Sequence, residues 1–175
     1  NMSYKKHITD TMKRLYNNKY ISIRDGNISF KPKNENFFYI SAGSVQKNNL
    51  NEDQVIKVDF ENKKISNKGQ YPYNLSYNKN LKYTPSREIY MHSYLQTHPN
   101  YFDKDIFVVH AHPPNIISYI GINKSYQLNN IKNIFPELNV GEIGKNVKYY
   151  DAGSQDLAIN CYKNLLNNDI IGLEK

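Results

Sequence analysis

Residues 106–114 read Ile106-Phe-Val-Val-His110-Ala-His112-Pro-Pro, and this stretch decides the fold. Four apolar residues lead into two histidines separated by one alanine. Side chains alternate along a strand, so both imidazoles are expected on one face at the end of a buried strand, which the prolines terminate. Neutral imidazoles are natural zinc ligands. An isolated His-x-His fits a pair of structural histidines equally well, so the rest of the chain must decide between the two interpretations.

Upstream of this strand, the pattern predicts one helix and then a section rich in strands. An apolar stripe at helical spacing predicts a helix over residues 3–19. Alternating or apolar runs between turn residues predict short strands at 21–23, 28–30, 37–40 and 55–60, a hairpin at 59–64 and a loop at 67–83.

From residue 84 onward the pattern alternates between helix and strand. Thr84-Pro85 is a helix start, with a hydroxyl N-cap and proline at the first position, and this helix is expected to reach Thr97. The remaining expected elements are a helix at 115–120, a strand at 147–150, a helix capped by Ser154 and a strand at 169–173. A β-meander followed by this alternation favours a single α/β domain over residues 1–175, with a mixed sheet and helices on its faces.

Composition narrows the class of protein. The 175 residues are 39% apolar and 22% charged, which is typical of a globular domain. The net charge of +7 comes from scattered lysines without a dense basic run, so a solvated surface is favoured over nucleic-acid binding. Cys161 is the only cysteine, which excludes a disulfide within the chain. With no apolar run of membrane-spanning length and no signal-peptide core, we expect a cytoplasmic protein without a membrane partner.

Glu88 and His92 lie four residues apart on the predicted helix before the histidine strand, so they share one face. If that face meets the strand end, Glu88 could serve as a metal ligand or as a general acid/base. The alternative is an ordinary solvated pair on a helix surface.

Three turns carry small or amide-bearing residues: Asp25-Gly26-Asn27, Ser41-Ala-Gly-Ser44 and Thr84-Pro-Ser86-Arg87. Such turns offer backbone N–H groups, hydroxyls and an amide to an anion, and Arg87 would add a charged donor fork. If the three turns converge in space, they would form a phosphate-binding pocket. Each turn taken alone is better explained as an ordinary loop.

Taken in order, these motifs resemble the class II aldolase/adducin family over nearly the full chain. The resemblance rests on six features in order: an N-terminal helix, Gly26-Asn27-Ile-Ser29, Ile40-Ser-Ala-Gly-Ser44, Pro85-Ser-Arg-Glu88 with His92, Val-Val-His110-Ala-His112-Pro, and a last helix with Leu-Leu followed by a strand.

The resemblance implies a three-layer α/β/α fold with a central, mainly antiparallel sheet, and a homotetramer. It implies zinc or another divalent metal held by three histidines, of which His110 and His112 are two, and it implies Glu88 as the catalytic acid/base. The residues implied to bind the substrate phosphate are Asn27, Ser41, Gly43, Ser44 and Ser86, and Arg87 is added to this set for its charged donor fork.

The chain departs from the family pattern in three places. The second turn reads Ala-Gly-Ser where Thr-Gly or Ser-Gly after a proline is usual, and Arg87 stands where a second serine is common. The family's third metal histidine follows a strand of the kind seen at 170–175, where this sequence ends. We therefore expect that the chain is truncated at its C-terminus or that the sequence is incomplete, and the sequence leaves open whether a third histidine follows Lys175.

The function implied by the resemblance is that of a metal-dependent lyase. Such an aldolase cleaves or forms a C–C bond in a small phosphorylated sugar through a zinc-stabilised enediolate. A sugar-phosphate epimerase, dehydratase or decarboxylase of the same fold and a non-catalytic, adducin-like binding domain are the alternatives.

Overall fold

The computed structural model describes residues 3–61, 74–122, 126–137 and 139–174. Helix α1 (Tyr4–Asn17) begins where the Ser3 hydroxyl accepts a hydrogen bond from the Lys6 amide at 3.1 Å. This bond satisfies one of the amides that the first turn leaves without a helical partner. Ile8 and Met12 are the buried residues on the apolar stripe of α1.

The described strands form one five-stranded sheet in the order β4-β3-β2-β1-β5, and every neighbouring pair is antiparallel. The strands are β1 (Asn27–Lys31), β2 (Phe37–Ser41), β3 (Val55–Phe60), β4 (Leu75–Ser76) and β5 (Ile106–His110). The mixed sheet expected from the helix–strand alternation is therefore wrong for these strands, because no described crossover helix joins two parallel neighbours.

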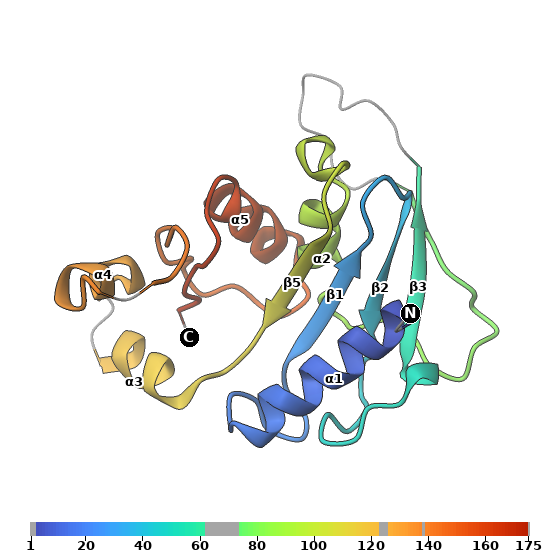
Figure 1. The fold of residues 1–175 in the computed structure, drawn as a ribbon, viewed down its shortest axis with the longest axis horizontal. Helices are drawn as coiled ribbons and strands as arrows, with labels where there is room; N and C mark the ends of the chain where they lie inside the picture. Colours follow the sequence, from blue (N-terminus) through green and yellow to red (C-terminus); the bar gives the residue numbers. More distant parts are fainter. Residues whose placement is uncertain (1–2, 62–73, 123–125, 138, 175) are drawn as a thin grey trace.

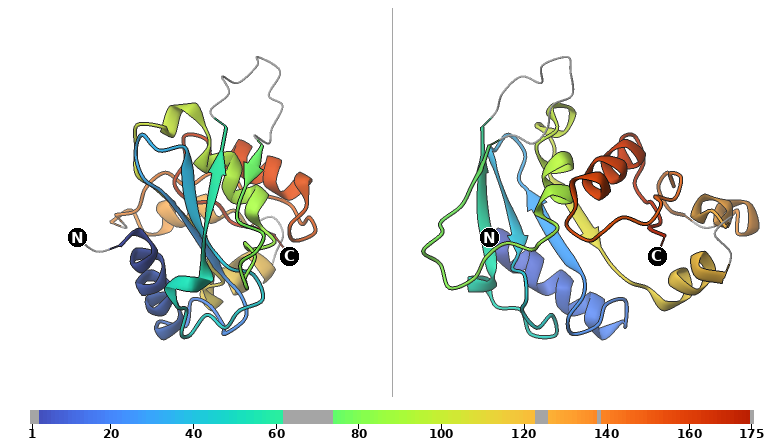
Figure 2. Two further views of the ribbon diagram at one scale, coloured as in Figure 1. Left: turned by 90° about the vertical axis from the view of Figure 1, so that its right-hand side faces the viewer. Right: turned by 180° about the vertical axis from the view of Figure 1, so that it is seen from behind.

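Helices cover both faces of this sheet. Helix α1 packs on one face, and α2 (Ile89–Gln96) with α5 (Gln155–Leu165) packs on the other (Figures 1 and 2). Helices α3 (Pro114–Ile122) and α4 (Ile131–Ile134) lie beyond the end of β5 (Figure 1). Short 3-10 turns complete the described elements: η1 (Glu52–Gln54), η2 (Pro99–Tyr101) and η3 (Leu128–Asn130). The expected three-layer α/β/α fold with an antiparallel sheet is confirmed.

Strand β1 is buried on both faces, but the two faces differ in chemistry. Ile28 and Phe30 pack in the apolar cluster under α1. Asn27, Ser29 and Lys31 occupy the alternate positions, and all three are buried as well. This polar face of β1 lies opposite α2, and it provides the floor of the site described below.

Helix α2 begins later than the sequence predicts. Its first residue is Ile89 and its N-cap is Glu88, so a start at Thr84-Pro85 is wrong. Pro85 instead makes a β-bridge with Ala42, and the Gly43 amide donates to the Thr84 carbonyl at 3.0 Å. This pairing holds residues 84–86 extended and carries Glu88 to the end of β1.

Three predicted strands do not form. Residues 21–23 make a turn in which the Ser22 amide donates to the Asp25 carboxylate at 2.6 Å. Residues 147–150 and 169–173 contribute single parallel bridges, Val147 with Leu173 and Ile143 with Ile170, instead of joining the sheet. Of the predicted hairpin at 59–64, residues 62–64 lie outside the described residues.

Candidate active site

One open cleft of about 790 Å³ lies where β1, β5 and the start of α2 meet. Most of the predicted site residues line it: Asn27, Gly43, Ser44, Ser86, Arg87, Glu88, His110 and His112. Ser41 does not, because it is fully buried and its hydroxyl accepts a hydrogen bond from the Ile28 amide at 3.1 Å. The structure thus brings together the two histidines, the carboxylate and residues of all three turns, with Ser41 as a packing contact between strands.

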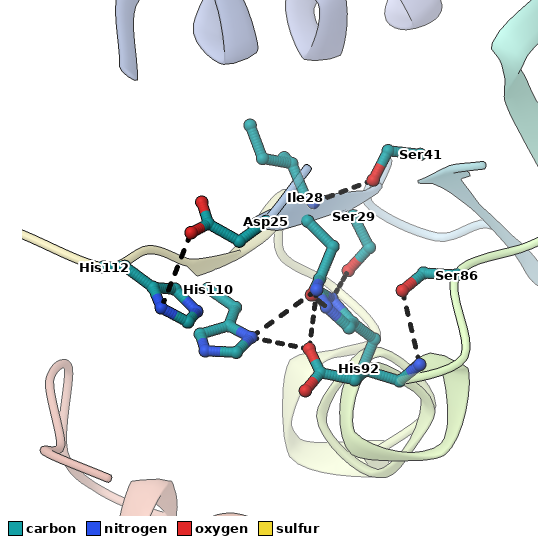
Figure 3. A network of polar contacts seen from close by, with 10 residues as sticks. Asp25, Ile28, Ser29, Ser41, Ser86, His92, His110 and His112 are labelled. Atoms are coloured by element: carbon teal, nitrogen blue, oxygen red, sulfur yellow. Dashed lines mark hydrogen bonds and ion pairs between the residues drawn. The ribbon is translucent and has the colours of Figure 1, made fainter. Parts of the chain in front are cut away.

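His110 and His112 lie side by side, with ring centroids 4.8 Å apart (Figure 3). His110 ends β5 and stands opposite Asn27 in the β1–β5 register. The backbone stays extended one step further, since the His112 amide donates to the Tyr20 carbonyl at 2.7 Å. The alternation of side chains therefore places both imidazoles on the same side, as the sequence predicts.

Glu88 lies against His110 with only 8% of its surface exposed. Its Oε2 accepts a hydrogen bond from the Asn27 amide nitrogen at 2.6 Å and lies 2.6 Å from His110 Nδ1. Burial alone would raise the pKa of Glu88, but the bonds and charge of His110 and the bond from Asn27 outweigh it and lower the pKa to about 2. Glu88 is accordingly a carboxylate at neutral pH.

His92 is completely buried behind Glu88, on the inner face of α2. Its Nε2 contacts the side-chain oxygen of Asn27, and its Nδ1 lies 2.7 Å from the Ser29 hydroxyl. Burial lowers the pKa of His92 to about 3, with His110 adding to the effect and Glu88 opposing it, so the ring is neutral at pH 7. The sequence placed His92 on the same helix face as Glu88 but gave no signal of these polar contacts.

Both cleft histidines present Nδ1 to a carboxylate. His110 faces Glu88, and His112 Nδ1 lies 3.8 Å from Asp25 Oδ2 (Figure 3). Metal-ligating histidines typically hold their second nitrogen against a carboxylate in this way, which orients the ring and raises its basicity. The pair therefore fits two ligand positions of a divalent metal. Among the residues described, no group of three or more His, Cys, Asp or Glu side chains is arranged to hold an ion.

Cationic side chains line the other part of the cleft. Arg24, Lys47 and Arg87 are present there, next to Ser44 and Ser86. Lys47 is only 4% exposed, and its ammonium donates to the Ala42 carbonyl at 3.0 Å. Burial lowers the pKa of Lys47, and Asp25 partly offsets this. Sequence reasoning missed Lys47 because one lysine among many carries no distinguishing pattern.

Several hydrogen-bond donors that the sequence assigned to an anion are already bonded within the protein. The Gly43 amide is taken by Thr84, and the Ser86 amide donates to the Ser41 carbonyl at 3.0 Å. Asn27 uses its side chain on Glu88 and His92. Any anion in this cleft would therefore meet side chains, above all the three cations, rather than those backbone N–H groups.

A second, apolar cavity of about 270 Å³ adjoins the same histidine pair. Its walls come from β5, α2, α3, α5 and residues 170–173, and they include Met91, Val108, Ile116, Ile120, Leu165 and Ile171. His110 and His112 thus separate a polar cleft from an apolar space.

Solved structures of the same architecture include several aldolases. The chain superimposes on an L-fuculose 1-phosphate aldolase with a TM-score of 0.71 at 17% identity, covering 99% of this chain and 73% of that one. A sugar-phosphate aldolase from Thermotoga maritima gives 0.71 at 15% identity over 94% of this chain and 78% of its own. YgbL from Escherichia coli is described as a “putative aldolase/epimerase/decarboxylase”. It superimposes with a TM-score of 0.72 at 15% sequence identity, covering 97% of this chain and 73% of that one. At these identities the likeness shows the fold.

A match over almost the whole sequence identifies the family. Residues 6–174 match the model of the class II aldolase and adducin N-terminal domain, and the chain belongs to that family. No curated protein sequence matches it significantly. No helix among the described residues is long and apolar enough to cross a membrane.

Proposed function

We propose that this protein is a metal-dependent lyase that cleaves or forms a C–C bond in a small phosphorylated sugar. The observation that carries the proposal is the contact of Glu88 with His110, at 2.6 Å, beside His112 in a cleft that also holds three cationic side chains. A carboxylate base, a pair of metal-type histidines and a cationic anion site are the parts that such a reaction needs.

The metal-binding role is assigned to His110 and His112, and the preferred ion is zinc. When bound, the ion would supply Lewis-acid stabilisation of negative charge on the substrate oxygens. Glu88, ionised and buried beside the pair, is assigned the proton transfer at the reacting carbon or oxygen. Its low pKa favours the base form, and the protonated form is reached only transiently during turnover.

The substrate phosphate is assigned to the cationic part of the cleft. Arg24, Lys47 and Arg87 would neutralise its charge, and the hydroxyls of Ser44 and Ser86 would donate to its oxygens. By the same family resemblance we propose a cytoplasmic homotetramer, which light scattering of the purified chain would test.

Elemental analysis of the purified chain tests the metal assignment. We expect divalent metal after zinc supply in the wild type, and its loss in His110→Ala and in His112→Ala. His7→Ala, on α1 and outside the cleft, is the matched control and is expected to retain the metal. A wild-type chain without metal after zinc supply would contradict the lyase assignment for this chain.

A panel of ketose 1-phosphates, scored for triose-phosphate release, tests the reaction. Glu88→Gln keeps the shape of the side chain and removes the base, so we expect turnover to fall by roughly 10²- to 10⁴-fold. Isomerised, dehydrated or decarboxylated products would reassign the reaction to an epimerase, dehydratase or decarboxylase. A chain that binds neither metal nor any substrate would support an adducin-like binding domain.

A further inference from the structure

A chain of buried side chains runs from the C-terminal end of α2 to the Glu88 carboxylate. It consists of Gln96, Ser29, His92 and Asn27, and three of these, Gln96, Ser29 and His92, have no exposed surface. We propose that His92, with Ser29 and Gln96 behind it, is a positioning residue that sets the orientation of the Asn27 amide and thereby holds the Glu88 carboxylate in place. The proposal rests on the function proposed above only in giving Glu88 its catalytic role.

The hydrogen-bond direction at the far end is set by a backbone carbonyl. The Gln96 amide nitrogen donates to the Ile106 carbonyl at 3.1 Å and to the Ser29 hydroxyl oxygen at 2.8 Å. A rotated amide would place the Gln96 oxygen against the Ile106 carbonyl, two acceptors with no proton between them. Ser29 therefore accepts from Gln96 and has its single hydroxyl proton left to donate.

The Ser29 hydroxyl donates its proton to His92, because it already accepts a hydrogen bond from Gln96. Its oxygen lies 2.7 Å from His92 Nδ1, so Nδ1 is the acceptor and the ring proton of neutral His92 is on Nε2. His92 Nε2 then donates to the side-chain oxygen of Asn27. The Asn27 amide is thereby held with its NH₂ group toward Glu88.

The near end of the chain requires the same arrangement independently. A carboxylate only accepts hydrogen bonds, so the group that lies 2.6 Å from Glu88 Oε2 must be the NH₂ of Asn27. Its oxygen must then face His92, which needs a donor at Nε2. The Ile106 carbonyl at one end and the Glu88 carboxylate at the other therefore require the same position for every proton along the chain.

Only one of the two carboxylate oxygens of Glu88 is held by Asn27 and His110. Oε2 takes both the Asn27 and the His110 contacts, whereas Oε1 takes neither of these bonds. We therefore assign the proton transfer to Oε1. His92, Ser29 and Gln96 do not line the cleft, so they act through Asn27 and do not touch the substrate.

Nitrogen-15 NMR of the histidine rings tests the assignment without any substrate or metal. At pH 7, His92 is expected as the neutral tautomer with the proton on Nε2, and Ser29→Ala is expected to shift its Nδ1 resonance. Ser93→Ala is the matched control, because this buried serine of α2 donates to the Tyr90 carbonyl and lies outside the chain. A ring protonated on Nδ1, or on both nitrogens, at pH 7 would overturn the proposal.

Kinetics on the ketose 1-phosphate cleaved fastest in the panel above tests the consequence. Loss of an outer hydrogen-bond partner commonly costs 10- to 100-fold, so Ser29→Ala is expected to lower kcat by roughly that factor with KM nearly unchanged. Ser29→Thr, which restores the hydroxyl, is expected to recover most of the loss, and Ser93→Ala to leave kcat unchanged. Equal kcat in Ser29→Ala and wild type would refute the positioning role. If no sugar phosphate is cleaved, the proposed function fails, and the NMR result still decides the hydrogen-bond assignment.

Discussion

At the scale of single residues, His92 differs most from what its sequence position suggests. A histidine four residues after a glutamate reads as one member of a surface pair, yet it is fully buried and its pKa is lowered to about 3. An isolated buried imidazole is costly unless both ring nitrogens find partners, and Ser29 and Asn27 supply them. These partners are 63 and 65 residues away in the chain, so no local pattern could have revealed them.

The buried His92 ring makes stability dependent on pH. Its pKa is about 3 when folded and near the ordinary 6.5 when unfolded, so the unfolded chain binds the extra proton between these values. The free energy of unfolding should therefore fall as pH drops through this window, by about 2 kcal/mol between pH 7 and pH 5 from this group alone. Urea unfolding of wild type and His92→Gln should show this part of the dependence removed in the variant. His7→Gln serves as the control, and an unchanged pH dependence in His92→Gln would contradict the prediction.

Lys47 gives a second prediction at this scale. Its buried ammonium lines the cationic part of the cleft, where it would form a charged hydrogen bond to the substrate phosphate. Such bonds contribute about 1.5–3 kcal/mol, so Lys47→Met should raise KM for a sugar phosphate by roughly 10- to 100-fold with a small effect on kcat. Steady-state kinetics would measure this, with the exposed Lys145→Met as control. A KM equal to that of the wild type would remove Lys47 from the phosphate site.

At the scale of elements, the sequence predicted amphipathic helices best. For strand β1, it predicted the strand but not the burial of both its faces. The residues of α1 and α5 repeat at helical spacing and carry serine caps, and both helices form close to the expected positions. Strand β1 alternates apolar and polar residues, a pattern typical of a strand with one face in water. Its polar face is buried instead, because α2 supplies hydrogen-bond partners. The start of α2 was misplaced because the bridge from Ala42 to Pro85 is a tertiary contact.

The cap of α5 can be tested directly. The Ser154 hydroxyl accepts a hydrogen bond from the Leu157 amide at 3.1 Å, and α5 packs on α2 through Leu157, Ala158 and Cys161. Ser154→Ala leaves that amide without its cap, so we expect a loss of about 1 kcal/mol in the free energy of unfolding. Chemical denaturation measures this loss. Ser118→Ala, at an exposed position inside α3, should change stability by less than about 0.5 kcal/mol, and an equal effect in both variants would contradict a specific capping role.

At the scale of the whole molecule, the order of motifs predicted more than any one of them. The His-x-His stretch alone could not be told from a structural pair. The fold brings Glu88 to His110 because β5 lies beside β1 and α2 packs across both. Sequence spacing gave the order of these elements but could not give the side-chain contacts between them, such as that of Asp25 with His112.

Metal binding should also be visible in the stability of the whole domain. A ligand that binds only the folded state adds RT ln(1 + [L]/Kd), or about 2.7 kcal/mol at a hundredfold excess over Kd. Thermal unfolding with and without zinc should therefore show a higher Tm with zinc in the wild type and no shift in the double variant His110→Ala/His112→Ala. The double variant in which Glu137 and Glu142 are replaced by Gln, away from the cleft, should still shift. A zinc-induced rise of the same size in the histidine variant would place the ion elsewhere.

The register between β1 and β5 has a consequence for folding fidelity. Asn27 pairs with His110 and Ser29 with Val108, which puts both polar side chains under α2. A slip by one residue would turn Ile28 and Phe30 toward α2 and the polar side chains toward the apolar cluster under α1. His92 and Gln96 would then be buried without partners, at a cost of about 1–3 kcal/mol for each unmet group. The side chains that hold the Glu88 carboxylate therefore also favour the native register of β1 and β5, because a shifted register would leave them without hydrogen-bond partners.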